Sequence, residues 1–418
     1  MGLKLIDLAK AIKEIIYKNG SANISRNRKS NEFDALLFCL LHTQKGFSMD
    51  SSAAVLNDLN GKFLNKKHIS RQSLSDRFNN LPEDFFKDTC FDIFNLIDNM
   101  YENKPNHSQI YGSYDICGVD GSENNLSKSL TNENFKANKN GNTVTALNIG
   151  VYNVTRNYPI TLEMVNHKNE RKAFLDFVND RKDFSNSIFV FDRGFDGVQF
   201  FNNLEKRNLK YVCRLKCNST LLSDNENDVD YIRNYYQRKV RIIKYKIEEK
   251  NYYLATNLFD SNEFTIDILK QIYHERWTIE EFFKYIKRNF NFGKSELKSA
   301  VAIRKSIYCQ LIITKIVNLL YKTNMRKRKN LQNNRIINKK TITDGLYRNF
   351  LFLMMYGKLN RKNIYEFTKN YIVLMTTNRG KHNERICITP YTKWYTKQHV
   401  MKKNHKKKIK NEKDKDAD

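Results

Sequence analysis

The sequence has no apolar run of the ~18 residues that a membrane-spanning helix needs. The longest candidate, IYCQLIITKIVNLLY at residues 307–321, is interrupted by Gln310 and Lys315. The N-terminal segment alternates charged and aliphatic residues at helical spacing, which is not the pattern of a secretory signal. We therefore expect a soluble cytoplasmic protein with no membrane-spanning segment.

Cysteines are few, and nothing in their pattern indicates a disulfide framework. The seven cysteines are odd in number, scattered, and mostly embedded in apolar runs such as those around Cys39 and Cys309. They are typical of buried thiols in a reducing compartment. Only Cys213 and Cys217 lie close together, and without a second ligand pair they indicate a structural role rather than a zinc site.

Acidic residues are scarce relative to basic ones. The 418 residues include 73 Lys and Arg against 45 Asp and Glu, which gives a formal charge of +28. Codon bias in an AT-rich genome inflates Lys, but it also raises Asp and Glu, so it does not explain their shortfall. The charge therefore predicts a polyanionic partner, and nucleic acid is the leading one.

The chain is long enough for two or three domains, and the spacing of its apolar residues changes along its length. Apolar residues recur at helical spacing up to a polar connector near residue 105, so residues 1–105 are expected to form a helical DNA-binding domain. An α/β domain is expected at 110–300. Residues 301–400 return to a helical pattern, and 401–418 form a charge-rich tail typical of disorder.

One segment of the helical region has the pattern of a reading helix. In KKHISRQSLSDRFNNL, residues 66–81, Ser70 is a suitable N-cap for a short polar helix that carries Arg71, Gln72 and Arg77. This resembles the reading segment of a helix-turn-helix, so these three side chains are candidates for DNA contact. The alternative is an ordinary polar surface helix.

The central region alternates strand-like and helical segments. Three strands, a helix, a fourth strand and a second helix predict a mixed α/β sheet flanked by helices. Further strand-like runs predict a β-rich insertion at about 210–256. The strand-like runs are at 114–122, 143–154, 158–166, 187–195, 210–217, 238–248 and 251–259.

Two aspartates lie where predicted strands end. Asp120 follows ICGV and precedes Gly121, and Asp192 follows IFVF and precedes Arg193 and Gly194. Functional groups are commonly exposed where the strands of an α/β sheet end. Each aspartate taken alone is equally typical of a turn or a helix cap.

The stretch YHERWTIEEFFKYIK, residues 273–287, places four polar side chains on one helix stripe. At about 100° per residue, Tyr273, Arg276, Glu280 and Lys287 fall within a sector of about 60°. An apolar sector lies beside them, so the stripe is expected at the edge of a core. The alternative is a solvated face with one Glu–Arg pair. The apolar sector comprises Ile272, Ile279, Phe283, Ile286 and Phe290.

Three carboxylates from these segments suggest a metal site. If neighbouring elements bring Asp120, Asp192 and Glu280 together, their repulsion requires a cation, and hard oxygen ligands suit Mg²⁺ or Mn²⁺. Two such ions can activate water or a 3′-hydroxyl in phosphodiester chemistry. A basic protein with such a site points to a nuclease or a strand-transfer enzyme.

The motifs GVDGS, VFDRGF, LATNL and Y-x2-R-x3-E-x6-K, in this order, resemble the DDE transposases of bacterial insertion sequences, specifically the insertion sequence 4 family. The resemblance covers about residues 110–300. It implies a ribonuclease-H-like core with a β-rich insertion before the glutamate, and it implies that Asp120, Asp192 and Glu280 are the catalytic, metal-binding triad.

The resemblance also implies which residues contact DNA. It assigns contacts to transposon-end DNA to Tyr273, Arg276 and Lys287. Trp277, one residue from Arg276, is a candidate for an aromatic that receives a flipped base, but its helical angle, near 40°, equally allows packing, and we assign it to the core. The implied function is cut-and-paste transposition of double-stranded DNA between transposon ends and target DNA, by a homodimer on paired ends at the bacterial nucleoid. The alternatives are a domesticated metal-dependent nuclease and a non-catalytic inhibitor of transposition.

Overall fold

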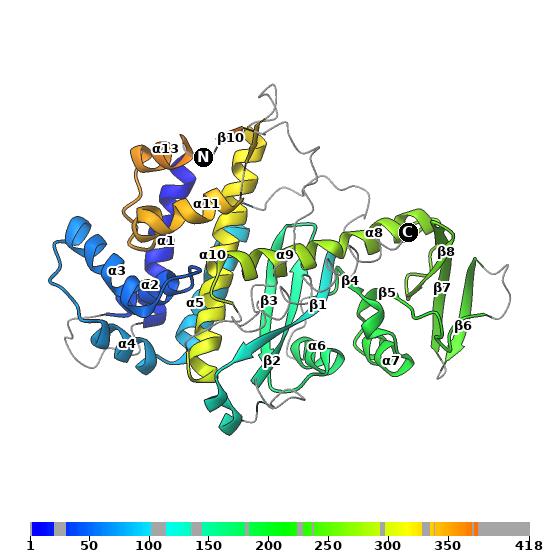
Figure 1. Cartoon of the computed structure of the whole chain (residues 1–418). Coiled ribbons are helices and arrows are strands. Elements are labelled where there is room, and N and C mark those ends of the chain that lie inside the picture. Colours follow the sequence, from blue (N-terminus) through cyan, green and yellow to red (C-terminus); the bar gives the residue numbers. More distant parts are fainter. Residues whose placement is uncertain are drawn as a thin grey trace, which may run out of the picture. The chain divides into compact units, whose positions relative to one another are not determined.

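Figure 1 shows the computed structural model of the whole chain. Met1–Leu331 and Ile337–Ile372 form one compact unit, and residues 332–336 and 373–418 form a second. The expected tail at 401–418 and residues 375–400 of the predicted helical C-terminal region lie outside the described residues. The described residues are 2–20, 31–101, 114–133, 135, 144–179, 184–223, 229–235, 238–292, 297–327, 335–337, 339–369 and 372–374.

An eight-stranded mixed sheet forms the centre of the first unit, in the order β3-β2-β1-β4-β5-β8-β7-β6. The first three strands are antiparallel, and β4 and β5 run parallel to β1. The predicted ribonuclease-H-like mixed sheet is therefore confirmed. The bounds are β1 Asp115–Leu126, β2 Val144–Asn153, β3 Tyr158–Val165, β4 Ser187–Phe191, β5 Lys210–Arg214, β6 Asp230–Tyr235, β7 Arg238–Ile247 and β8 Lys250–Thr256.

The segment expected as a β-rich insertion divides in two. β5 pairs with β4 in the main sheet, whereas β8, β7 and β6 extend that sheet by antiparallel pairing. The strand β6 was not predicted, because its burial alternates between exposed and half-buried residues and it has no apolar run.

Helices cover both faces of the sheet (Figure 1), which explains why residues 116–119 of β1 form an apolar run. Cys117 and Val119 pack in one cluster with α6 (Glu170–Asn179) and α7 (Val198–Lys206). The alternate residue Ile116 packs in another cluster with α8 (Ile266–Glu275). The fully buried β2 has the same cause, since α9 (Trp277–Asn289) lies over it.

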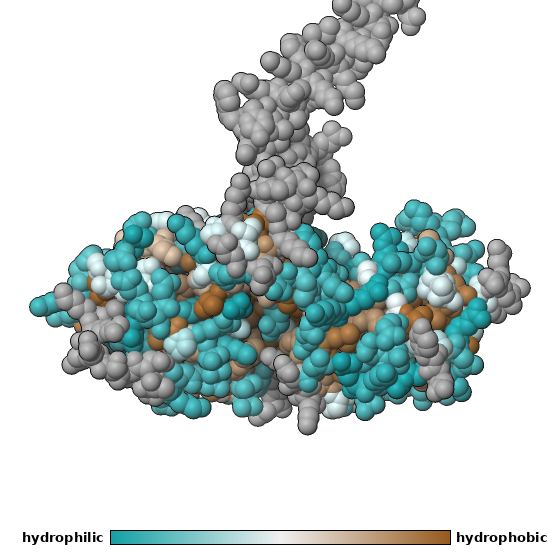
Figure 2. All heavy atoms as spheres, turned by 90° about the horizontal axis from the view of Figure 1, so that it is seen from below, coloured by the Kyte–Doolittle hydropathy of each residue, from teal (hydrophilic) through white to brown (hydrophobic). Residues whose placement is uncertain are grey.

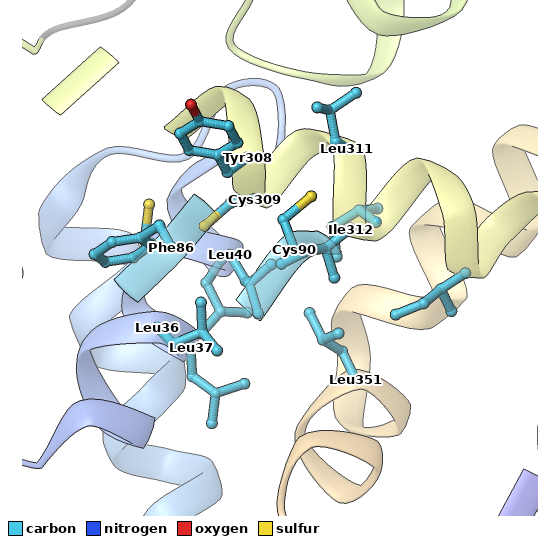
Figure 3. Close-up of a cluster of buried hydrophobic side chains, with 14 of the residues drawn as sticks. Leu36, Leu37, Leu40, Phe86, Cys90, Tyr308, Cys309, Leu311, Ile312 and Leu351 are labelled. Carbon is cyan, nitrogen blue, oxygen red and sulfur yellow. The ribbon is translucent and has the colours of Figure 1, made fainter. Parts of the chain in front are cut away.

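The N-terminal helices share one hydrophobic core with the C-terminal helices. In Figure 3, Leu36, Leu37 and Leu40 of α2 face Cys90 of α5 and Cys309 of α10. The boundary at residue 105 stays a prediction, but the helical cores on its two sides are continuous. The helices are α1 Gly2–Gly20, α2 Glu32–His42, α3 Met49–Leu64, α4 Arg71–Asn80, α5 Glu83–Tyr101, α10 Ala300–Lys327, α11 Lys339–Gly345, α12 Leu351–Met355 and α13 Arg361–Lys369.

The hydrophilic surface and the burial of most cysteines agree with the sequence-based expectations. Hydrophilic residues cover most of the face in Figure 2. Of the cysteines in the described part of the chain, Cys217 is exposed, which departs from the expectation of buried thiols, and the others are buried. No helix among the described residues is long and apolar enough to cross a bilayer.

Candidate active site

The sheet brings the two aspartates to the same edge. β1 and β4 are parallel neighbours, with Gly118 of β1 opposite Val190 of β4. Asp120 lies two residues beyond Gly118, in the middle of β1 rather than at the strand end that the sequence predicted, and Asp192 directly follows β4. Both residues therefore lie near the carboxyl end of β4, a place where functional groups collect in α/β folds.

Asp192 occupies a cap position without capping. It precedes the short 3-10 helix Arg193–Phe195, but its side chain makes no capping hydrogen bond. Instead, its Oδ1 accepts a hydrogen bond of 3.4 Å from the hydroxyl of Tyr273. The cap alternative therefore does not describe this aspartate.

Two glycines let α9 approach the sheet beside Asp120. A Cβ at Gly150 would lie 2.9 Å from Cζ of Phe283, and one at Gly118 would lie 3.4 Å from Ile279. Gly150 is the β2 partner of Asp120. The close packing of α9 at these glycines therefore carries its first turn, which includes Glu280, toward Asp120.

The pKa of Asp120 reflects the charged groups that this packing brings near it. The pKa of its carboxyl is raised to about 6, chiefly by burial, and the nearby carboxylates of Glu170 and Glu280 contribute to this rise. The Gly121 N–H, which donates to Oδ1 at 2.9 Å, and the Arg276 guanidinium act in the opposite direction. Asp120 and Glu280 therefore lie in one acidic site, and the positively charged guanidinium of Arg276 lies beside them.

Arg276 faces the acidic site rather than solvent. Its Nη2 donates a 2.6 Å hydrogen bond to Oε1 of Glu280, and the residue is only 8% exposed. Tyr273 is half-buried, and its ring centroid lies 5.8 Å from the guanidinium. The Glu–Arg pair of the alternative interpretation exists, but it does not lie on a solvated face.

The predicted single helix over the stripe is two helices. Tyr273 lies in α8 and Glu280 in α9, and Arg276 at the junction keeps right-handed helical angles of φ −52 and ψ −30. The two helices follow each other end to end in Figure 1.

Lys287 completes the stripe at the far end of α9. Burial lowers the pKa of its ammonium group, and the nearby Asp120 carboxylate opposes that shift. The backbone carbonyl of Lys287 accepts a 2.9 Å hydrogen bond from Lys45 in the loop between α2 and α3. The side chain of Asn291 donates to the carbonyls of His42 and Phe47 at 2.8 and 3.0 Å. The N-terminal helices therefore hold the end of α9 in place.

Glu170 is the site residue that the sequence reasoning missed. It opens α6, and a Cβ on Gly121 would lie 2.2 Å from its Oε1. Burial raises the pKa of the Glu170 carboxyl, and the Asp192 carboxylate is the next cause. Glu170 therefore is a fourth carboxylate, close to both aspartates. Its only sequence signal is its position at the start of a helix after the third strand.

The turn after Asp192 is held by the neighbour of Glu170. Arg171 donates hydrogen bonds of 2.9 Å to the carbonyl of Gly194 and 2.7 Å to that of Asp196. The Asp196 carboxylate is buried and accepts from the backbone N–H of Lys216 at 2.9 Å. These bonds fix the backbone that presents Asp192.

Trp277 corrects an expectation. The indole is 54% exposed, so its assignment to the core was wrong. The Lys284 ammonium lies 4.9 Å from its ring centroid. Its helical angle turns it away from the apolar face of α9, and the sequence offered no partner on that side.

The candidate reading helix α4 forms as predicted, but its side chains differ in exposure. The Ser70 side chain accepts from the Ser73 N–H, which confirms the N-cap. Arg71 is exposed beside Asp50, and Gln72 is exposed. Arg77 is only 12% exposed and lies 3.6 Å from the nearly buried Glu32 carboxylate. DNA contact by these residues stays a prediction, and Arg77 has a structural partner.

The donor chemistry of the site fits a hard divalent cation, since it offers carboxylate oxygens in a partly buried setting. As the side chains stand, no three Asp, Glu, His or Cys groups within the described ranges are grouped closely enough to hold a metal ion. The Glu280 carboxylate is directed to Arg276 instead. Metal ligation therefore requires Glu280 to change partner.

The fold and the site define a ribonuclease-H-like domain with acidic residues from β1, α6, α9 and the turn after β4 gathered in one region. Residues 116–314 match the family model of the transposase DDE domain. The chain also shares 32% identity over 142 residues with a protein described as a transposase for insertion sequence element IS4SA from Synechocystis sp., a match that spans 32% of this chain and 41% of the relative. Both matches are to transposases, so the chain is similar to the DDE transposases of the insertion sequence 4 family, as the motifs predicted.

The fold is also similar to a solved structure, the piggyBac transposase synaptic complex with hairpin DNA. The TM-score is 0.42 at 12% sequence identity, over 90% of this chain and 84% of the other.

Proposed function

We propose that this chain is a cut-and-paste DNA transposase. It binds the terminal inverted repeats of its element, hydrolyses phosphodiester bonds with Mg²⁺ or Mn²⁺, and joins the freed 3′-hydroxyl ends to target DNA. The observation that carries the proposal is that Asp120 lies within β1 and Asp192 directly after the adjacent strand β4, while the packing of α9 brings Glu280 toward Asp120.

In this proposal, Asp120, Asp192 and Glu280 hold the metal. When bound, the metal activates the attacking oxygen and stabilises the leaving one. Tyr273 orients Asp192 through its hydroxyl, and Arg276 neutralises charge beside Glu280.

Two partners belong to the same proposal. Tyr273, Arg276 and Lys287 contact phosphates of the transposon end, because all three lie on the stripe that borders the carboxylates. The protein works at the nucleoid as a homodimer on paired ends, because the two ends of an element must be cut and joined together.

One experiment distinguishes the proposed transposase from the two alternatives, a metal-dependent nuclease and a non-catalytic inhibitor. The purified full-length chain is incubated with Mg²⁺, a linear duplex that ends in the inverted repeat of the element, and a supercoiled target plasmid. A transposase yields cleaved ends and end–plasmid joints, and EDTA removes both products. A metal-dependent nuclease yields cleavage without joints, and a non-catalytic inhibitor yields a shifted complex without cleavage; either result contradicts the proposal.

A further inference from the structure

A cleft of about 630 Å³ lies beside α9, away from the candidate active site. Helices α10 and α11 and the turn between β2 and β3 form its other walls. The α9 residues that line it are centred about 140° around the helix from Glu280 and Lys287. The two cations among them, Lys284 and Arg288, lie about 50° and 90° from that pair. One helix therefore borders the acidic site on one side and this cleft on another.

The cleft is strongly basic. Four cationic side chains line it, Lys284, Arg288, Lys339 and Lys340, and Glu281 is the one acidic residue among its lining residues. Four positive charges minus one negative charge leave a formal +3. The Glu281 carboxylate already accepts a 2.7 Å hydrogen bond from Lys284, and both side chains are largely exposed. The field in the cleft therefore favours an anion.

The rest of the lining suits a phosphate backbone. Thr278, Asn157 and Asn289 add hydroxyl and amide groups, which pair readily with phosphate and sugar oxygens. Lys339 lies deeper, with its ammonium 5.1 Å from the Tyr321 ring centroid, and burial lowers its pKa. An anion bound there would offset that loss of solvation.

We propose that this cleft binds the sugar-phosphate backbone of target duplex DNA, separately from the transposon end. The inference rests on the proposed function, because strand transfer brings two polyanions to one set of carboxylates. Two duplexes repel each other, so each requires its own neutralising side chains. α9 supplies both sets: Lys287 on the side of Asp120, and Lys284 with Arg288 on the side of the cleft.

The test measures how DNA affinity depends on salt, by fluorescence anisotropy with the full-length chain. One probe is a labelled duplex of the terminal inverted repeat. The other is a labelled random-sequence duplex, added to protein already saturated with unlabelled repeat duplex. The test variant is Lys284→Gln/Arg288→Gln, and Lys339→Gln examines the deep wall. The control is Lys206→Gln/Lys270→Gln, which removes the same charge; Lys270 pairs with Asp267 as Lys284 pairs with Glu281.

We expect the slope of log K against log salt for the random duplex to become shallower by about 1.8 in the double variant, about 0.9 per lost contact. Lys339→Gln should lower it by about half as much, and the repeat duplex should keep its slope. Equal losses with both probes would assign the cleft to the transposon end and overturn the inference. It is also overturned if neither probe changes, or if the control changes as much as the test variant.

Failure of the proposed function would be visible elsewhere. It would appear as wild-type protein that does not cleave the repeat duplex in Mg²⁺, whereas the cleft inference depends only on the variant slopes.

Discussion

α4 and α9 both carry basic side chains that the sequence makes candidates for DNA contact, yet the structure gives the two sets different surroundings. On α9 the stripe borders a site of partly buried carboxylates, and Arg276 and Lys287 each face one of them. On α4 the two arginines lie about 120° apart around the helix, and Arg71 is exposed while Arg77 lies against Glu32 of α2. Spacing thus fixes which residues share a helix face, whereas the neighbouring elements decide what that face meets.

The largest expected effect concerns the carboxylates beside α9. Asp120→Asn and Asp192→Asn should each reduce Mg²⁺-dependent cleavage by about 1000-fold or more, equivalent to ~4 kcal/mol, because each removes a charged oxygen ligand. The measurement is single-turnover cleavage of the inverted-repeat duplex. Asp267→Asn, an exposed carboxylate on α8, is the matched control and should cleave normally. An active Asp192→Asn enzyme would remove Asp192 from the site.

The two arginines of α4 sharpen the comparison through stability. Arg77→Ala leaves the nearly buried Glu32 carboxylate without its partner, so we expect a loss of about 3 kcal/mol in the free energy of unfolding. Arg71→Ala breaks an exposed pair and should lose less than about 1 kcal/mol. Urea unfolding followed by circular dichroism measures both. If Arg77→Ala had normal stability and no longer discriminated end DNA, Arg77 would be a reading residue after all.

Arg71 and Gln72 are the α4 residues still placed to read bases. Alanine at either position should reduce the preference for end DNA over random DNA by about 1–3 kcal/mol, because each base contact is worth that much. Competition gel shifts with the full-length chain measure this preference. Unchanged discrimination in both variants would move end recognition away from α4.

The smallest expected effect is on pH dependence. The folded pKa of Asp120 is about 6, above its ordinary value, so the folded state holds this proton more tightly than the unfolded state. The stability contributed by this group is therefore present at low pH and is lost as pH rises through about 6. Asp120→Asn cannot ionise and escapes that loss. Its Tm relative to wild type, in EDTA, should be higher at about pH 7.5 than at about pH 5; a difference that is constant with pH would contradict this account.

Much of the fold was predictable because the strands are buried on both faces and therefore read as apolar runs. The two aspartates were predictable as candidates because each directly follows an apolar run, although Gly121 after Asp120 continues β1 and does not form the predicted turn. Glu170 was not, since a glutamate that opens a helix is ordinary and only the tertiary approach to Gly121 brings it to the site. The burial of Arg77 depends on the tertiary contact with Glu32 of α2, which helical spacing does not reveal. The exposure of Trp277 follows from its position on α9 away from the apolar face, where no element among the described residues covers most of the indole.

Two adjacent glutamates on α9 provide the most direct test of the central claim. Glu280 is bonded to Arg276 and lies within the field of Asp120, whereas Glu281 is exposed and paired with Lys284. Each is replaced by Gln, which keeps size and hydrogen bonding but removes the charge. Cleavage of the inverted-repeat duplex in Mg²⁺ is then measured side by side, after both variants are shown to bind that duplex.

The account predicts that Glu280→Gln binds the repeat duplex and does not cleave it, while Glu281→Gln cleaves at close to the wild-type rate. An active Glu280→Gln enzyme, or an inactive Glu281→Gln enzyme of normal stability, would contradict the assignment of Glu280 as the third carboxylate.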